Sequence, residues 1–170
     1  MKKFVSILVL ACAPAVAFAA GEHSDGHGSP GHSMGSHGMD GHIMSGMSGI
    51  GKPGDPAKVN RTIEVVMDDT MSFIPAQINV NAGETIRFLI KNMGKLQHEM
   101  VIGSLDNLKA HAEEMKKLPS MQHVEPNMIT LNAGQRGGLV WMFDQTGAVD
   151  FACLIPGHME AGMVGKVIVN

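Results

Sequence analysis

The chain has 170 residues, a length that fits one domain with additional segments. Its formal net charge is −3 at pH 7 with histidine neutral, so no broad basic surface favours nucleic-acid binding. Tyrosine is absent and aromatic residues make up 4% of the sequence, which leaves few side chains on which single-stranded nucleic acid would stack. Nucleic acid is therefore excluded as the expected partner.

The first 19 residues have the pattern of a secretory signal peptide. Two lysines follow Met1, residues 4–18 are mostly apolar, and Ala17-Phe18-Ala19 provides a small-residue cleavage site. The apolar run is too short for a comfortable transmembrane span, so we expect no stable membrane insertion once the signal is removed. The alternative is a lipoprotein anchor, because Val9-Leu10-Ala11 before Cys12 loosely resembles a bacterial lipoprotein box.

Residues 20–57 are predicted to form a disordered, metal-binding tail. The segment is rich in glycine and serine and has no apolar periodicity, so it buries too little surface to fold without metal. Histidines recur every five residues from His27 to His42, and a methionine lies two residues after each of the last three. Imidazole mixed with thioether favours copper over zinc or harder ions. The alternative is a flexible linker of biased composition. The candidate ligands are His23, His27, His32, Met34, His37, Met39, His42, Met44 and Met47.

Residues 58–170 are predicted to form one domain of β-strands. Short runs in which apolar and polar residues alternate are separated by turn residues, as in Asn81-Ala82-Gly83-Glu84. About eight short strands in a domain of this size are typical of an all-β, antiparallel Greek-key sandwich. The runs are residues 63–67, 78–80, 86–90, 98–102, 128–131, 138–143, 149–153 and 164–169.

One helix is predicted between these strands, near residues 105–118. Leu105, Leu108, Ala112 and Met115 are spaced three and four residues apart, which places them on one helical face. A serine before this segment can cap its start, and a proline after it ends the helical pattern. The helix is therefore an insertion in the sandwich.

The segment after the helix contains a second group of soft ligands. Met121 and His123 lie close together in sequence, and Met128 follows them. They are candidates for an accessory metal site, since imidazole and thioether both bind copper. The alternative is an ordinary polar loop that packs on the sandwich.

Residues 153–163 place a cysteine, a histidine and a methionine on one short loop. Cys153, His158 and Met163 are spaced five residues apart. Thiolate and thioether are soft ligands suited to Cu(I), and imidazole also binds Cu(II), so a Cys/His/His site with a weak axial Met holds both redox states. Pro156 and Gly157 form a turn that brings His158 back towards the sulfur. We therefore predict a copper site that needs one more histidine from elsewhere in the chain.

This spacing, with a Pro-Gly pair inside it, resembles the ligand loop of the cupredoxins, the small blue-copper proteins such as azurin, plastocyanin and auracyanin. The resemblance covers residues 58–170. In that family the remaining ligand is a histidine at the end of an earlier strand, and His98 matches this position. Many members have asparagine directly after it, where its side chain helps tie the two ligand loops together, whereas this chain has Glu99. The resemblance implies a type 1 copper site of His98, Cys153, His158 and Met163.

The inserted helix and the segment His123-x-Glu125-Pro126-Asn127-Met128 extend the similarity to a bacterial subgroup. This subgroup comprises periplasmic cupredoxins associated with copper tolerance, and its members often carry a His/Met-rich N-terminal extension. The resemblance therefore implies a periplasmic protein that binds or redox-buffers copper, with a tail that captures more of it.

The alternative function is dedicated one-electron transfer between redox partners, which needs the copper site but not the tail. An apolar rim around His158 would let a periplasmic redox protein or a copper exporter dock there. An enzyme is not expected, because copper oxidases and nitrite reductases of this fold generally join several domains. A cysteine nucleophile activated by His158 is also disfavoured, because both residues belong to a loop that contains a methionine ligand.

Overall fold

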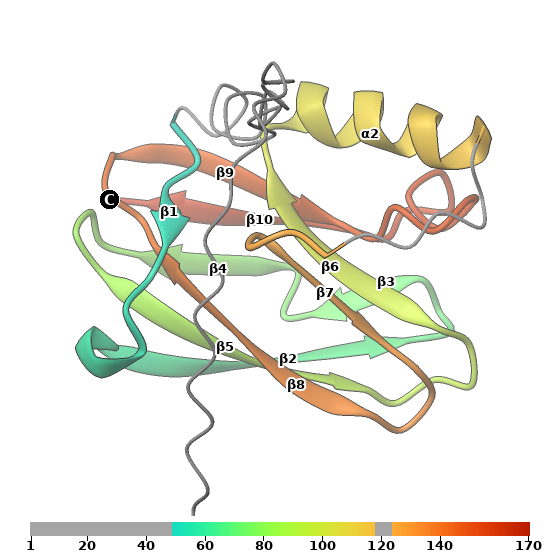
Figure 1. The fold of residues 1–170 in the computed structure, drawn as a ribbon, viewed down its shortest axis with the longest axis horizontal. Helices are drawn as coiled ribbons and strands as arrows, with labels where there is room; N and C mark the ends of the chain where they lie inside the picture. The colour runs from blue at the N-terminus through green and yellow to red at the C-terminus, as the bar shows by residue number, and fades with distance from the viewer. Residues whose placement is uncertain (1–48, 118–123) are drawn as a thin grey trace, which may run out of the picture. The chain divides into compact units, whose positions relative to one another are not determined.

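The computed structural model describes residues 49–117 and 124–170. Within them lie ten strands, a short 3-10 helix η1 and one α-helix, α2 (Figure 1). The strands are β1 (Lys52–Pro53), β2 (Arg61–Asp68), β3 (Ser72–Ile74), β4 (Gln77–Val80), β5 (Thr85–Asn92), β6 (His98–Gly103), β7 (Met128–Leu131), β8 (Arg136–Met142), β9 (Gly147–Ala152) and β10 (Val164–Val169). The helices are η1 (Pro56–Lys58) and α2 (Leu105–Lys117).

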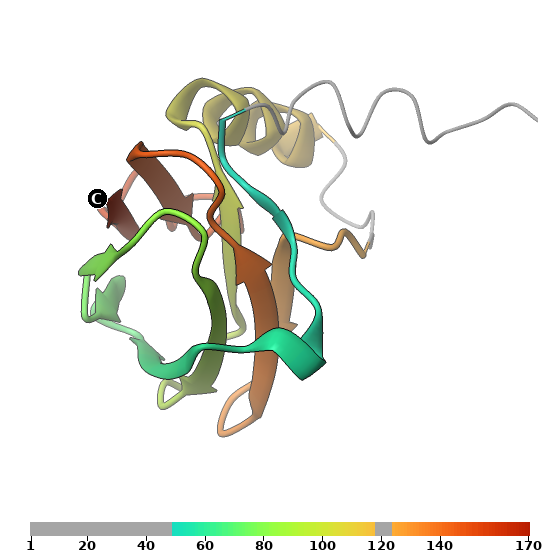
Figure 2. The same cartoon turned by 90° about the vertical axis from the view of Figure 1, so that its left-hand side faces the viewer.

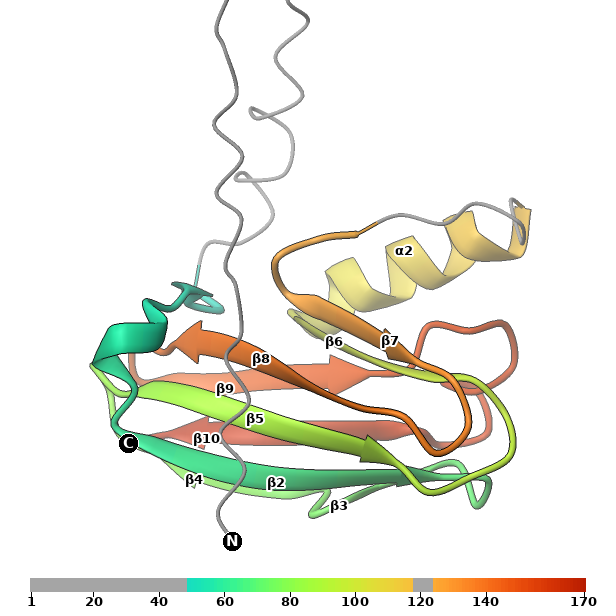
Figure 3. The same cartoon turned by 60° about the horizontal axis from the view of Figure 1, so that its bottom comes forward.

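The strands form two five-stranded sheets with the orders β1-β8-β5-β2-β3 and β4-β10-β9-β6-β7. The long strands of both sheets lie roughly along one common axis, with arrows pointing both ways along it (Figure 3). Alternating residues of each sheet face inward, and they build one apolar core. Phe73 and Phe151 come from different sheets and meet edge to face, with ring centroids 5.0 Å apart. The predicted β-sandwich is therefore confirmed.

Two strand pairs correct the expectation of a purely antiparallel sandwich. Among the described strands, β2 pairs with β5 and β4 pairs with β10 in parallel. The chain leaves β2 through β3, enters the other sheet as β4, and then returns to the first sheet as β5. Strands joined by such a crossover can run in the same direction, whereas a tight hairpin enforces antiparallel pairing. Alternation of apolar residues is the same in both cases, so the sequence pattern does not distinguish them.

The folded part begins before residue 58, where the sequence placed its boundary. Ile50 is 4% exposed and belongs to the core, and its carbonyl oxygen accepts a 2.7 Å hydrogen bond from the indole N–H of Trp141. Strand β1 pairs with β8 and forms one edge of that sheet. A Cβ added at Gly51 would lie 2.2 Å from the carbonyl oxygen of Met142, so this close approach requires glycine. The glycines and prolines that indicated a linker here serve the packing of an edge strand.

Helix α2 matches the predicted helix and lies outside the sandwich (Figure 2). The hydroxyl of Ser104 accepts a hydrogen bond from the backbone N–H of Asn107 at 3.3 Å, as expected for a cap. Leu108 and Ala112 are buried in a second apolar cluster. That cluster also contains Leu154, so the helix packs against the start of the predicted copper loop. Neither helix in the described ranges is both long and apolar enough to cross a membrane.

Candidate metal centre

Strands β6 and β9 bring the first histidine and the cysteine together at one end of the sandwich. His98 is the first residue of β6, and Cys153 directly follows β9. The two strands are antiparallel neighbours, so the start of one lies beside the end of the other. His158 returns to this end on the loop that follows β9. One ligand atom from each of the three residues lies within 4.8 Å of the others.

Cys153 is completely buried and forms no disulfide among the described residues. Burial raises the pKa of its thiol to about 12, and the nearby Glu99 carboxylate acts in the same direction. The backbone N–H of Glu99 points to the sulfur, with a nitrogen–sulfur distance of 3.4 Å. In this environment the free protein carries a neutral thiol at pH 7. A thiolate here needs a compensating positive charge, which a metal ion supplies.

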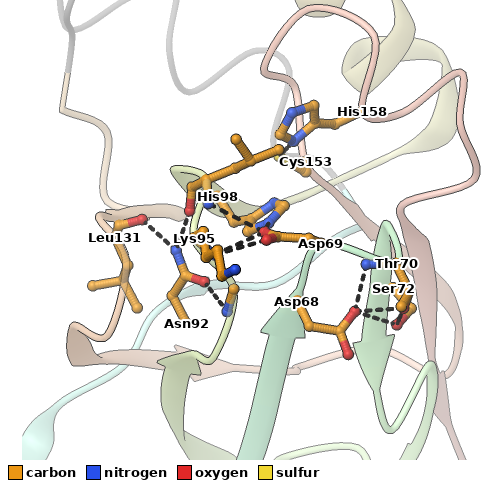
Figure 4. A network of polar contacts seen from close by, with 12 residues as sticks. Asp68, Asp69, Thr70, Ser72, Asn92, Lys95, His98, Leu131, Cys153 and His158 are labelled. Atoms are coloured by element: carbon orange, nitrogen blue, oxygen red, sulfur yellow. Dashed lines mark hydrogen bonds and ion pairs between the residues drawn. The ribbon is translucent and has the colours of Figure 1, made fainter.

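His98 is also completely buried, and its two ring nitrogens have different surroundings. Nε2 lies 3.1 Å from a carboxylate oxygen of Asp69. Figure 4 shows this contact as a dashed line between the two side chains. Nδ1 is buried without a hydrogen-bond partner in the structure. A buried polar atom without a partner is costly and uncommon. The vacant bonding capacity of Nδ1 is therefore an independent indication that this atom binds a metal.

His158 lies close to both of the other residues. Its Nδ1 atom is 3.3 Å from the sulfur of Cys153, and its ring centroid is 4.9 Å from that of His98. Partial burial lowers the pKa of His158, and the neighbouring His98 lowers it further. A lowered pKa keeps the imidazole neutral at pH 7, which is the form that binds metals.

The backbone of the loop closes on itself around Met163. The backbone N–H of Cys153 donates to the carbonyl of Met163 at 3.1 Å, and the N–H of Met163 donates to the carbonyl of His158 at 3.0 Å. Gly157 and Gly162 have positive φ angles of 91° and 102°, as the predicted turns require. The side chain of Met163 is buried in the same core cluster as Cys153.

Glu99 joins the two segments that carry the ligands. It is only 6% exposed, and one carboxylate oxygen accepts a hydrogen bond from the backbone N–H of Leu154 at 2.9 Å. The other oxygen accepts a hydrogen bond from the Thr130 hydroxyl at 3.3 Å. In many cupredoxins an asparagine ties the loops at this position. Glu99 makes the corresponding link here, so the departure from the family pattern leaves the connection in place.

The remaining predicted ligands fall outside the described residues, in positions 1–48 and 118–123. They are His23, His27, His32, Met34, His37, Met39, His42, Met44, Met47, Met121 and His123. The signal peptide and Cys12 lie outside the described residues as well. One residue of the site was not predicted from the sequence: Asp69, whose carboxylate contacts the ring of His98. This residue is 29 positions before His98, and no motif or spacing connects the two.

The donor set fits copper. It combines a soft sulfur with two imidazole nitrogens, and no carboxylate belongs to the three-residue cluster. Harder cations such as Mg²⁺ and Ca²⁺ prefer oxygen ligands, whereas Cys/His sites with a weak methionine suit copper. A β-sandwich with this cluster at one end is a copper protein of the cupredoxin class.

Comparison with known proteins gives the family. The model of the copper-binding proteins of the plastocyanin/azurin family matches residues 60–170. The chain therefore belongs to this family, whose members are copper-binding proteins rather than enzymes.

Three relatives share the same name, copper-resistant cuproprotein CopI. The protein from Rubrivivax gelatinosus is 55% identical over 120 residues, which cover 71% of this chain and 73% of the relative. The protein from Pseudomonas aeruginosa is 36% identical and covers 71% of this chain and 82% of the relative. The protein from Vibrio cholerae is 34% identical over 72% of this chain and 73% of its own length. The chain is thus a homologue of these copper-resistance proteins.

Solved structures agree on the fold. Auracyanin B superposes with a TM-score of 0.59 at 24% identity, over 71% of this chain and 96% of that protein. An azurin from Methylomonas sp. strain J gives a TM-score of 0.52 at 18% identity, over 66% of this chain and 99% of that protein. Both comparisons bear on the sandwich alone.

Proposed function

We propose that the protein binds copper through four side chains and thereby contributes to copper tolerance. The observation that carries this proposal is the cluster of three ligand atoms, in which the buried Nδ1 atom of His98 has no hydrogen-bond partner among the described residues. The name of the relatives, copper-resistant cuproprotein, supports the physiological role. The four ligands are His98, Cys153, His158 and Met163.

Each ligand has a distinct role. Cys153 would supply a thiolate, His98 and His158 would supply imidazole nitrogens, and Met163 would supply a weakly bound thioether. When bound, copper adds one-electron chemistry between Cu(I) and Cu(II). The chain itself excludes water by burying Cys153 and His98, and it holds their backbone positions through adjacent strands. Rigid placement of this kind lets one site accept both oxidation states without large movement.

We assign the N-terminal segment the capture of additional copper. The regular His-x-Met units of residues 20–48 supply many imidazole and thioether groups within a short span. Several weak sites on one chain raise the local copper-binding capacity without any change in the folded site. The apolar segment before them indicates export, so we place the mature protein in the periplasm.

A second candidate function is electron transfer to a docked protein. His158 is only partly buried, and the loop before His98 exposes two apolar side chains, with Met93 56% and Leu96 48% exposed. Exposed apolar side chains near a redox site favour a short-lived complex. The partner would be a periplasmic redox protein or a copper exporter that docks near His158.

Copper titration of the mature protein tests the central proposal, with visible absorption and total bound copper followed together. We expect an intense thiolate-to-Cu(II) band that disappears in Cys153→Ser. Absence of the band in the unaltered protein would refute the site.

The role is tested by growth in copper. A deletion strain should regain tolerance with the unaltered gene but not with Cys153→Ser. Full rescue by Cys153→Ser would separate tolerance from this site. If the strain with Cys153→Ser loses electron flow to a periplasmic acceptor but keeps its copper tolerance, the second function is favoured.

A further inference from the structure

Asp69 lies at the turn between β2 and β3 and contacts the loop that precedes β6. Its carboxylate accepts hydrogen bonds from the backbone N–H of Lys95 at 2.8 Å and of Leu96 at 3.1 Å. The Nε2 atom of His98 lies 3.1 Å from the oxygen that also binds Leu96. Three groups that belong to one short segment therefore converge on a single carboxylate (Figure 4).

The backbone around Asp69 is shaped for this contact. A Cβ atom added at Gly94 would come within 2.1 Å of the Asp69 oxygen, so any other residue there would displace the carboxylate. The two backbone hydrogen bonds lower the pKa of Asp69, and the contact with His98 lowers it further. Because each of its two oxygens already accepts a backbone N–H, the Asp69 carboxylate acts as a hydrogen-bond acceptor through both oxygens although its side chain is 36% exposed.

An ionised carboxylate only accepts hydrogen bonds, which determines the state of the ring it contacts. Neutral histidine has one N–H donor and one acceptor nitrogen. In its neutral form, His98 therefore carries its proton on Nε2 and its lone pair on Nδ1. Nδ1 is the buried ring atom that has no hydrogen-bond partner within residues 49–117 and 124–170.

We propose that Asp69 is a positioning residue for copper: it holds His98 as the Nε2–H tautomer, with Nδ1 ready to bind the metal before copper arrives. This inference rests on the proposed copper site. Hydrogen bonding to a carboxylate also makes an imidazole a stronger donor, and such partners of metal-bound histidines are worth about 10–100-fold in metal affinity. A stronger nitrogen donor favours Cu(II) over Cu(I), so Asp69 lowers the reduction potential of the site.

The first test needs no copper. Nitrogen-15 NMR of the copper-free protein at pH 7 reports which ring nitrogen of His98 carries the proton. We expect the Nε2–H form in the unaltered protein and a mixture of tautomers in Asp69→Asn. A predominant Nδ1–H form in the unaltered protein would overturn the proposal, even if the variant does not fold.

The second test compares Asp69→Asn with Asp68→Asn. The Asp68 carboxylate accepts hydrogen bonds from Thr70 and Ser72 rather than from His98, and the substitution removes the same charge one residue away. We expect Asp69→Asn to weaken Cu(II) binding by about 10–100-fold. Each tenfold loss relative to Cu(I) corresponds to a rise of about 59 mV in the reduction potential.

The control should change affinity by less than about threefold, because the Asp68 carboxylate is hydrogen-bonded to Thr70 and Ser72, and charges that are not in direct contact interact weakly through water. Equal effects of the two substitutions on Cu(II) affinity would mean that Asp69 acts only through its negative charge and not through its contact with His98, and would overturn the proposal. If the unaltered protein shows no thiolate-to-copper band, the proposed function fails. The tautomer measurement still decides the role of Asp69 towards His98, so the two failures are distinguishable.

Discussion

A carboxylate oxygen of Glu99 accepts a hydrogen bond from the backbone N–H of Leu154 at 2.9 Å, which joins the residues that directly follow the two ligands His98 and Cys153. Both partners are buried. The link therefore holds the start of β6 and the end of β9 together before any metal binds.

Removal of this link should destabilise the copper-free protein. In Glu99→Ala the buried N–H of Leu154 loses its acceptor, at a cost of about 1–3 kcal/mol in the free energy of unfolding. Glu99→Gln keeps an oxygen in the same position and should lose less. Chemical denaturation of both copper-free variants measures the difference. Equal destabilisation by alanine and glutamine would show that the hydrogen bond to Leu154 is not the stabilising contact.

Copper affinity should increase with pH because of Cys153. Burial raises the pKa of its thiol to about 12, so the free protein carries the proton throughout the neutral range. Copper binds the thiolate and releases that proton, so affinity should rise about tenfold for each pH unit between about pH 6.5 and 8. Competition with a chelator of known affinity, repeated across this range, provides the measurement. A flat profile would mean that the free protein already holds a thiolate.

The same pKa predicts the stability of the copper-free protein in alkali. The folded-state pKa of Cys153 lies above the ordinary value of 9.0, so burial of the thiol favours the folded state fully below about pH 9. Stability should then fall as pH rises from about 9 towards 12, because the unfolded chain releases the proton more readily. Cys153→Ala removes this dependence. The denaturation midpoints of the unaltered protein and of Cys153→Ala are compared at pH 8 and 10. The unaltered protein should lose stability relative to the variant between these pH values, and an unchanged difference would contradict the raised pKa of Cys153.

The segment before residue 58 should contribute to the stability of the sandwich. Ile50 is 4% exposed in the core, so Ile50→Ala should cost about 2–5 kcal/mol. Val124 is 96% exposed, and Val124→Ala should change stability by no more than about 0.5 kcal/mol. Denaturant unfolding of both variants measures the contrast. A cost for Ile50→Ala as small as that of the control would place residue 50 outside the folded unit.

Deletion of the histidine-rich segment should separate the two kinds of copper binding. A truncated protein that begins at residue 49 lacks the histidine-rich segment but keeps Ile50 and β1. A deletion that extends to residue 57 would also remove part of the sandwich. We expect the shorter deletion to lower the number of copper ions bound and to leave the thiolate-to-copper band unchanged. Metal analysis with absorption spectroscopy tests this. An unchanged copper stoichiometry would assign all binding to the folded domain.

Much of the site could be predicted because its information is local. The spacing of Cys153, His158 and Met163 is set within one loop, and a turn of proline and glycine acts over a few residues. Eight of the ten described strands and α2 could likewise be predicted from apolar periodicity, because burial of one face imposes a repeat on neighbouring residues. The two short strands β1 and β3 were missed, because two or three residues are too few to show such a repeat. The first histidine ligand, His98, could be assigned only through the resemblance to a family, since nothing in its neighbouring sequence distinguishes it.

The tertiary structure decided the contacts between distant loops. Asp69 meets His98, and Glu99 meets Leu154, only because the two packed sheets bring the ends of β2 and β9 beside the start of β6. A hydrogen bond across such a distance leaves no periodic pattern in sequence, and its partners depend on register and sheet order. The parallel pairing of β2 with β5 could not be predicted either, because it also depends on sheet order rather than on a local pattern. The sequence by itself determined which atoms are available to bind copper, and the fold decided which residues orient them.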